Sequence, residues 1–261
     1  MIKKIFAIAI LGLLCIGGRL TPADASTDIS VTLHPEQIMM GAAFDGEHVS
    51  VAGRIPSDAS ALIRITGKTE DNNLKQKGRA LGVLWMNLGS VEISRAPNVF
   101  LLYLPAEGNP GPAAEQASWR KLGIGLDGLR KQVDIVSREK DKDALFDEFV
   151  KLKHKSGLYA TVENAVHYGE DDGKTKAFNA IVALPASLPQ GTYKFELLAI
   201  KDGAVEASVA RKIDAREVGL PAWISKLAFD HGTLYGVLAV LVALIAGLLT
   251  GIMFKGEKGA H

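Results

Sequence analysis

The sequence predicts a mainly β protein: an immunoglobulin-like antiparallel β-sandwich, one or two, with a short helical insertion and one C-terminal transmembrane helix. Three observations predict this class. Short apolar or alternating runs recur between turn-forming residues, and a helix-forming stretch interrupts them in the middle of the chain. An uncharged apolar run of 21 residues, Leu234 to Phe254, lies near the C-terminus.

Residues 1–25 are predicted to be a signal peptide. Lys3 and Lys4 form a basic start, an apolar run follows from Ile5 to Ile16, and the small-residue pattern Ala23-Asp24-Ala25 suits cleavage after Ala25. The apolar run is shorter than the roughly 20 residues of a spanning helix, so an uncleaved anchor is the weaker alternative.

Composition narrows the functional classes. Cleavage would remove Cys15, the one cysteine, so we expect neither a disulfide nor a thiolate metal site in the mature chain. The chain has 30 Lys and Arg against 29 Asp and Glu, and without its two ends 25 basic and 26 acidic residues remain. A region this close to neutral lacks the basic footprint of a nucleic-acid-binding domain, so no nucleic-acid partner is expected.

The first β region covers residues 26–106. Its expected strands are Ile29–Leu33, His48–Gly53, Ala61–Thr66, Gly82–Asn87 and Val99–Leu104. The expected turns are Phe44-Asp45-Gly46, Pro56-Ser57-Asp58, Asp71-Asn72-Asn73 and Pro97-Asn98. Short strands at this spacing favour an immunoglobulin-type sandwich.

Residues 107–157 form a connecting region in which helix formers dominate. Helices are expected at 114–122 and 138–155. In the second, Leu145, Phe149 and Leu152 fall at positions i, i+4 and i+7, which places them on one face. We expect this amphipathic helix to cap a sheet or to bridge two sheets.

Strands resume in a second β region, residues 158–213. The expected strands are Leu158–Val166, Lys176–Leu184, Thr192–Ile200 and Val205–Ile213. Asp202-Gly203 predicts a hairpin between the last two. Glu170-Asp171-Asp172-Gly173 is interpreted as a turn, because it lacks the alternating oxygen donors of a calcium-binding loop.

A juxtamembrane linker (214–233), a transmembrane helix (234–254) and a cytoplasmic tail (255–261) complete the chain. Twenty-one helical residues rise about 1.5 Å each and cross a hydrocarbon core of about 30 Å. Lys255 and Lys258 follow the span, and positive residues stay on the cytoplasmic side. We therefore expect a single-pass protein of the inner membrane with a periplasmic domain. We expect Trp223, which lies shortly before the span, to mark the outer lipid interface, where tryptophans are common.

Small residues recur every four positions within the span, at Ala239, Ala243, Gly247 and Gly251. This spacing lines them along one helix face and would permit close packing of a second copy, giving a homodimer, or of an integral membrane partner. Because glycine and alanine are common in such helices, chance spacing is the alternative.

Candidate chemistry is sparse. Gly123-Ile124-Gly125-Leu126-Asp127-Gly128 matches GxGxxG, but a helix-like segment precedes it where a dinucleotide site needs a buried strand, so a turn is expected. His154, His167 and His231 are scattered, and neither HExxH nor GxSxG occurs. We expect no catalytic residues and no cofactor.

The best metal candidate is a copper site of His34, Met39, Met40 and His48, since imidazole and thioether ligands suit copper in an exported protein. The simpler interpretation is that Ile38-Met39-Met40 is the apolar part of a strand, with methionine filling gaps in the core.

An ordered set of motifs extends over most of the exported part and the start of the span. It consists of Lys77-Gly78-Arg79, Gly82, Trp85-Met86-Asn87, Pro97, Phe100, Gly157-Leu158-Tyr159, Phe178, Leu184-Pro185-Ala186, Pro189-Gln190-Gly191-Thr192-Tyr193, Asp202-Gly203, Gly219-Leu220 and Leu234-Tyr235-Gly236. In these motifs the chain resembles an uncharacterised family of proteobacterial transmembrane proteins first collected from alphaproteobacteria. The resemblance implies a signal, an exported domain and one C-terminal span, and an association with permeases of the sulfite-exporter type.

These observations predict a non-enzymatic, membrane-anchored periplasmic interaction module, accessory to an integral membrane protein such as a permease. The alternative is a periplasmic copper or redox accessory protein that uses His34, Met39, Met40 and His48.

Overall fold

The structure is a computed structural model that describes residues 29–80, 84–105, 121–137 and 141–254. The predicted signal peptide (1–25) and the predicted cytoplasmic tail (255–261) lie outside these residues. So does the helix expected at 114–122, apart from its last two positions.

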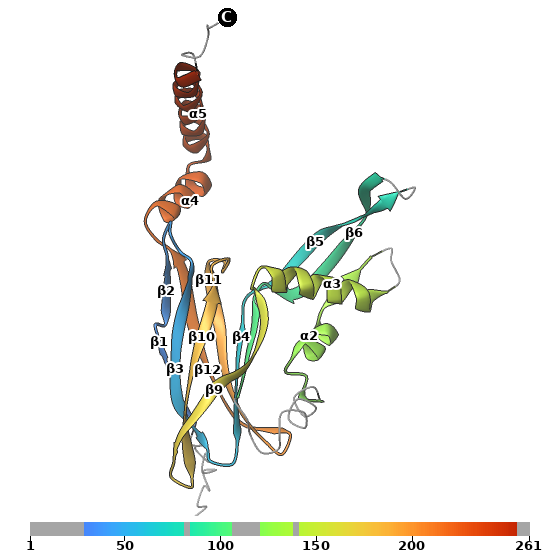
Figure 1. Cartoon of the computed structure of the whole chain (residues 1–261), viewed down its shortest axis with the longest axis vertical. Coiled ribbons are helices and arrows are strands. Elements are labelled where there is room, and N and C mark those ends of the chain that lie inside the picture. The colour runs from blue at the N-terminus through green and yellow to red at the C-terminus, as the bar shows by residue number, and fades with distance from the viewer. Residues whose placement is uncertain (1–28, 81–83, 106–120, 138–140, 255–261) are drawn as a thin grey trace, which may run out of the picture.

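Nine strands form one sheet in the order β1-β3-β10-β9-β7-β4-β11-β12-β2. Their bounds are β1 Ser30–His34, β2 Gln37–Met40, β3 Gly46–Pro56, β4 Ser60–Thr66, β7 Phe100–Pro105, β9 Tyr159–Asp171, β10 Thr175–Pro185, β11 Gly191–Lys201 and β12 Ala204–Glu217. Although β1 and β2 follow one another in the chain, they lie at opposite ends of this order, so the sheet curls back on itself (Figure 1).

Alternating side chains explain why these segments are strands. In β1, Val31 and Leu33 are buried while their neighbours are exposed, and β10 repeats the pattern with Phe178, Ala180 and Val182. Successive side chains of a strand point to opposite faces, so one face of each strand enters a shared core. Each large aliphatic side chain buried there contributes about 1.5–3 kcal/mol.

The two β regions expected from the sequence share this one sheet. Along its length β3 pairs with β10, and β4 pairs with β11, so strands from residues 26–106 hydrogen-bond to strands from residues 158–213. The predicted class is confirmed as mainly β with a helical insertion and one C-terminal apolar helix, and the curled sheet is compatible with a β-sandwich.

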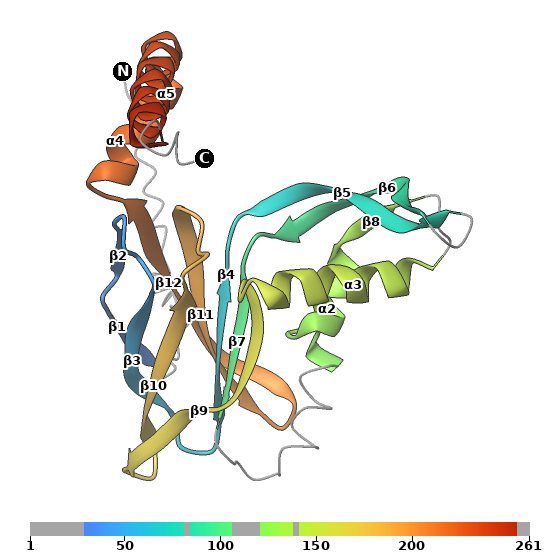
Figure 2. The same cartoon turned by 45° about the horizontal axis from the view of Figure 1, so that its top comes forward.

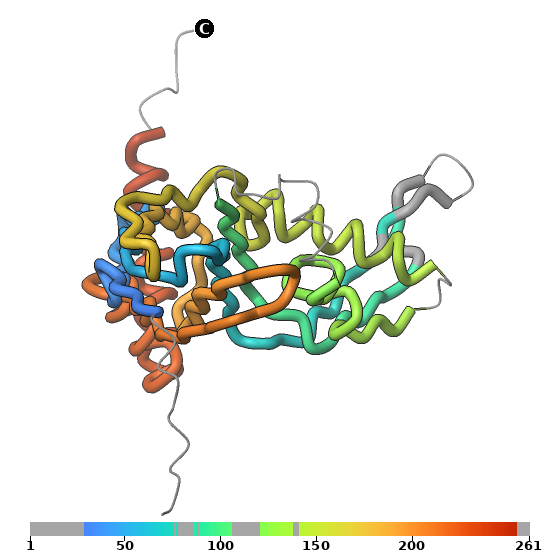
Figure 3. The backbone as a smooth tube through the Cα atoms, turned by 90° about the horizontal axis from the view of Figure 1, so that it is seen from below, coloured from blue at the N-terminus to red at the C-terminus, as the bar shows by residue number. Residues whose placement is uncertain are grey.

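A second, smaller body projects to one side of the curled sheet, as the view from below shows (Figure 3). We call it the wing. It contains a three-stranded sheet, β5-β6-β8, and two helices. The bounds are β5 Thr69–Ala80, β6 Leu84–Pro97, β8 Asp134–Val136, α2 Leu126–Gln132 and α3 Lys142–Lys155.

The wing corrects two details of the sequence analysis. Asp71-Asn72-Asn73, expected to be a turn, lies inside β5, where the register with β6 shifts between Glu70 and Asn72. In α3 the buried residues are Phe146 and Phe149, whereas Leu152 is 52% exposed. The apolar face of α3 is therefore rotated toward Phe146, which the i, i+4, i+7 pattern omitted.

A second core joins the wing to the sheet. The rings of Phe149 and Tyr159 meet edge to face with centroids 5.8 Å apart. The ring centroids of Phe100 and Tyr159 lie 5.9 Å apart. Aromatic pairs in such arrangements add about 0.5–1.5 kcal/mol beyond their buried area. The N-terminus of α3 is capped by Asp141, whose side chain accepts a hydrogen bond from the Ala144 backbone N–H at 2.9 Å.

Two predicted turns are confirmed. The turn expected at residues 170–173 connects β9 to β10 through residues 172–174, with the Asp172 N–H donating to the Thr175 carbonyl at 3.0 Å. Asp202 and Gly203 connect β11 to β12 at φ values of 50° and 77°. Positive φ at both central positions suits the twist of a tight hairpin, and aspartate and glycine tolerate it.

Two helices end the described chain. α4 spans Leu220–Asp230 and α5 spans Gly232–Phe254. The segment expected to be a linker, residues 214–233, thus holds the end of β12 and the whole of α4.

Candidate functional site

The end of the sheet that carries α4 and α5 is the best candidate for a functional surface. α5 has 23 residues, its most apolar stretch of 18 residues has a mean hydropathy of 2.7, and its residues are exposed throughout. Among the described residues it is the one helix long and apolar enough to cross a membrane. At about 1.5 Å per residue it covers roughly 35 Å, enough for a hydrocarbon core.

The connection between the sheet and α4 consists of two residues, Val218 and Gly219. The Val218 N–H donates to the Met40 carbonyl at 3.0 Å, which extends the β12–β2 pairing. Gly219 follows with φ 68° and caps α4, accepting from the Trp223 N–H at 3.1 Å. A positive φ at this point suits glycine. Only these two residues therefore separate the last strand of the sheet from the helix.

The wing joins the sheet at this same end. Gly191 pairs with Ala215 near the end of β12, so the loop before Gly191 lies at the α4 end of the sheet. From that loop, Ser187 Oγ donates to the carbonyl of Ser156 at the end of α3, at 2.5 Å. Figures 1 and 2 show the β5–β6 hairpin extending sideways and toward the α4 end.

A cleft of about 230 Å³ lies where the wing meets the sheet. Its apolar part includes Phe100, Ile124 and Leu129, all buried. Its charged part includes Arg64, Arg95, Lys194 and Glu196. Because the lining comes from both bodies, the shape of this cleft follows their relative position.

Ion pairs occupy the charged side of the cleft. Arg64 Nη2 lies 2.8 Å from Glu196 Oε2, and Lys194 Nζ lies 2.5 Å from Oε1. Burial acts to raise the pKa of the Glu196 carboxyl, but the Lys194 hydrogen bond and the Arg64 charge outweigh it and hold the pKa below its usual value. The two cations therefore favour the ionised form of the Glu196 carboxyl group.

Arg95 has an unusual backbone at the edge of the same cleft. Its φ is 60°, which is uncommon outside glycine, and its N–H donates to Asp71 Oδ1 at 3.3 Å. Its guanidinium pairs with Asp134 at 2.5 Å. Sequence reasoning missed this position, because the irregular register opposite Asp71 arises only when β5 and β6 pair.

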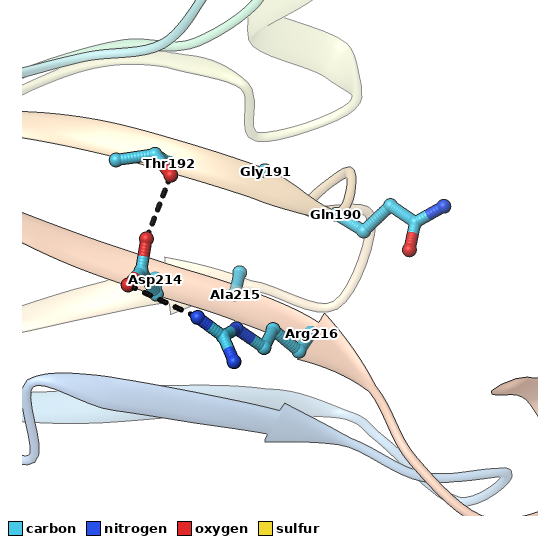
Figure 4. Close-up of a pocket in the computed structure, with 6 residues that line it drawn as sticks. All are labelled: Gln190, Gly191, Thr192, Asp214, Ala215 and Arg216. Atoms are coloured by element: carbon cyan, nitrogen blue, oxygen red, sulfur yellow. Dashed lines mark hydrogen bonds and ion pairs between the residues drawn. The ribbon is translucent and has the colours of Figure 1, made fainter.

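A shallow groove of about 260 Å³ lies between the start of β11 and the end of β12 (Figure 4). Thr192 Oγ1 donates to Asp214 Oδ1 at 2.7 Å, and Arg216 Nη2 lies 3.6 Å from Asp214 Oδ2. The first contact joins β11 to β12 at the α4 end of the sheet, and the second lies within β12.

The four copper candidates do not converge as a set. Met39 and Met40 point to opposite faces of β2, where Met39 is 70% exposed and Met40 is buried in the core. His34 pairs with Ser50, so His34 and His48 are diagonal neighbours on the outer face of β1 and β3. In the described part of the chain, no group of three or more His, Cys, Asp or Glu residues is placed to hold a metal ion. Copper binding by these residues stays a prediction.

The glycines of the GxGxxG match have a packing role. A Cβ on Gly128 would lie 1.8 Å from the Gly123 carbonyl oxygen, and Gly123 has φ 66°. The first half of the segment is a tight turn, and its second half, from Leu126, is the first turn of α2. His154 on α3, His167 on β9 and His231 between α4 and α5 are all exposed.

The small-residue positions of the span lie on α5 as expected. Ala239, Ala243, Gly247 and Gly251 are exposed along the helix. A side chain added at Gly247 or Gly251 would meet nothing within 4 Å. This face is open to another helix.

One comparison with known proteins decides the family. A family model described as Putative transmembrane protein (Alph_Pro_TM) matches residues 28–256. The chain belongs to this family. The match confirms the resemblance found in the sequence, and together with α5 it makes this Alph_Pro_TM member a membrane protein with one candidate C-terminal span. No curated protein matches the chain.

Proposed function

We propose that this Alph_Pro_TM member is a non-enzymatic interaction module, which a single span holds against the periplasmic side of the inner membrane. Its partner is an integral membrane protein such as a permease. The observation that carries the proposal is the two-residue connection, Val218 and Gly219, between a hydrogen-bonded strand and the helices that lead to the membrane. A tether this short keeps the β-domain at the bilayer surface.

The strand arrangement supports an immunoglobulin-like binding domain as the finer assignment. β3 pairs with β10, β4 pairs with β11, and β12 runs parallel to β2. Tyr193, at the start of β11, donates its hydroxyl hydrogen bond to the Pro189 carbonyl four residues upstream. A tyrosine that bonds back across this corner is a feature of immunoglobulin sandwiches. Fold alone does not determine function, so this support is by analogy.

Residue chemistry at the two ends supports the proposed orientation. Lys255 and Lys258 follow the span directly, and positive residues favour the cytoplasmic side. With a cleaved signal at residues 1–25, the β-domain and the wing would both face the periplasm. The wing would then extend sideways beside the bilayer, where the exposed part of a permease would lie.

Crosslinking from α5 in living cells tests the proposal. A photoreactive residue at Ala243 or Gly247 lies on the small-residue face, whereas Leu241 and Ile245 lie on the opposite side and serve as matched controls. We expect Ala243 and Gly247, but not the controls, to yield a specific product with a larger membrane protein.

Two other results are informative. A product of twice the chain's mass would assign the small-residue face to a homodimer in place of a permease. If all four positions gave the same crosslinked products in equal amounts, no face of α5 would be in specific protein contact. The helix would then meet only lipid, and the proposed helix contact would be overturned.

A further inference from the structure

We propose that α4 lies in the headgroup layer of the bilayer leaflet beside the β-sandwich, with its apolar face toward the acyl chains, and that it fixes how the domain sits on the membrane. The proposal rests on the membrane anchoring proposed above and not on the identity of any protein partner. Its occupant is the phospholipid surface itself.

Four of the five large apolar residues of α4 lie on one face, and the fifth, Phe229, is 85% exposed near the end of the helix. With about 100° between successive residues, Leu220, Trp223, Ile224 and Leu227 fall within an arc of about 100°. The side chains of Leu220, Trp223 and Ile224 are 60%, 58% and 39% exposed. An exposed apolar arc of this width, on a helix beside a span, has the pattern of a helix that lies in the membrane interface.

A hydrogen bond fixes which face meets the domain. Ser225 Oγ donates to Glu217 Oε2 at 2.6 Å, and Glu217 is the last residue of β12. On the helix, Ser225 lies about 150° from the middle of the apolar arc. Because Ser225 faces the sheet, the arc of Leu220, Trp223 and Leu227 is turned away from it.

The start of α5 sets the level of α4 relative to the bilayer. One residue, His231, separates the two helices, and its carbonyl accepts a hydrogen bond from the Tyr235 N–H at 3.0 Å. If α5 spans the hydrocarbon core, the end of α4 lies at the surface of that core. Figure 1 shows α4 turned across the end of the sheet, between the strands and α5.

The residue types on α4 match the chemistry of that layer. Tryptophan prefers the membrane interface, because its ring is apolar while its N–H can find a partner. The helix carries one cation, Lys226, and one anion, Asp230. Its charges balance, so we expect the contact to depend on buried apolar area and not on anionic lipid.

Depth-dependent quenching tests where Trp223 lies. The full chain is placed in nanodiscs as the Trp85→Phe, Trp119→Phe variant, which leaves Trp223 as the single tryptophan. Lipids brominated at shallow and deep acyl positions serve as quenchers. We expect stronger quenching by the shallow bromines, unchanged when anionic lipid is added.

The matched control moves the tryptophan onto the domain. A Lys212→Trp, Trp223→Phe variant in the same background places it at an exposed position of β12. We expect bromine to leave this tryptophan unquenched. If Trp223 is quenched no more than residue 212, or is shielded from both bromine and aqueous quenchers as under a protein partner, the lipid assignment is overturned.

The hydrogen bond of Ser225 provides a separate test of orientation. A fluorophore at Lys212→Cys, in the chain that also carries Cys15→Ser, reports rotation of the domain in nanodiscs through its anisotropy. We expect Ser225→Ala to lower the anisotropy while the depth of Trp223 is unchanged.

Thr250→Ala, which removes a hydroxyl hydrogen bond to Ala246 within α5, is the control and should change neither. Equal anisotropy in both variants would contradict the orienting role. The quenching and anisotropy measurements do not depend on a protein partner of α5, so they stay valid even if the crosslinking experiment above fails.

Discussion

Single carboxylates determine the local structure of the β9–β10 turn. Asp172 Oδ1 accepts hydrogen bonds from the backbone N–H groups of Thr175 and Lys174 at 2.7 and 2.9 Å, and Arg54 Nη2 lies 2.6 Å from Oδ2. These backbone hydrogen bonds are the largest of the effects that lower the pKa of Asp172 from 3.8 to about 2. The sequence predicted a turn here, but not that its second aspartate holds the turn closed.

This lowered pKa predicts a specific dependence of stability on pH. Because the folded pKa lies below the unfolded value, the ionised carboxylate stabilises the folded state above about pH 4, and this contribution is lost as pH falls toward 2. In Asp172→Asn we expect the free energy of unfolding to fall less steeply over that window. Denaturant titrations in detergent at several pH values measure the slope. Asp202→Asn, in the other tight turn, controls for the lost charge, and an unchanged slope in Asp172→Asn would contradict the prediction.

At the scale of an element, α3 shows how tertiary packing decides which helix face is buried. The sequence predicted that Leu145, Phe149 and Leu152 would form the apolar face, and the structure buries Phe146 and Phe149 instead. Periodicity located the helix within a few residues. It did not give the rotation, because that depends on Tyr159, which belongs to β9.

Two substitutions distinguish the faces of α3. Phe149→Ala should lower the free energy of unfolding by about 3–5 kcal/mol, because it removes a fully buried ring that contacts Tyr159. Leu152→Ala is the matched control and should cost less than about 0.5 kcal/mol, as an exposed position does. Denaturant unfolding followed by circular dichroism measures both. Equal losses would place Leu152 in the core.

Other elements were predictable to different extents. The strands that became β1, β4, β10 and β11 were found because they alternate or are continuously apolar. The polar residues of β5 concealed a strand, since Asp71-Asn72-Asn73 is typical of a turn when read alone. α4 was missed because an eleven-residue segment beside a long apolar run was interpreted as a linker.

At the scale of the whole molecule, strands distant in the chain interleave. Partners such as Ser50 and Ile181 in the β3–β10 ladder are more than a hundred residues apart. The sequence predicted the class, the helical insertion and the span from local patterns. Apart from the hairpin at Asp202-Gly203, it did not predict which strands pair, because pairing depends on contacts between segments that are individually similar.

Interleaving predicts that the chain cannot be divided between its β regions. Expressed separately, residues 26–157 and 158–261 should each fail to unfold cooperatively, because β3, β4 and β7 lose their partners β10, β11 and β9. A chain that ends at Asp230 keeps every described strand and is the control. Calorimetry and circular dichroism report the transitions. A cooperative transition in either fragment would show that it folds independently.

The edges of the two sheets differ in a way that bears on aggregation. The curled sheet ends in β1 and β2, strands of five and four residues, which offer few unpaired amides to another chain. In the wing β5 is twelve residues long and, among the described strands, pairs with β6 alone. Lys75 and Lys77 are exposed along it, and charged lysines on an edge discourage a foreign strand from adding to the sheet. Self-association through strand addition, if these lysines were replaced, would therefore begin at the wing.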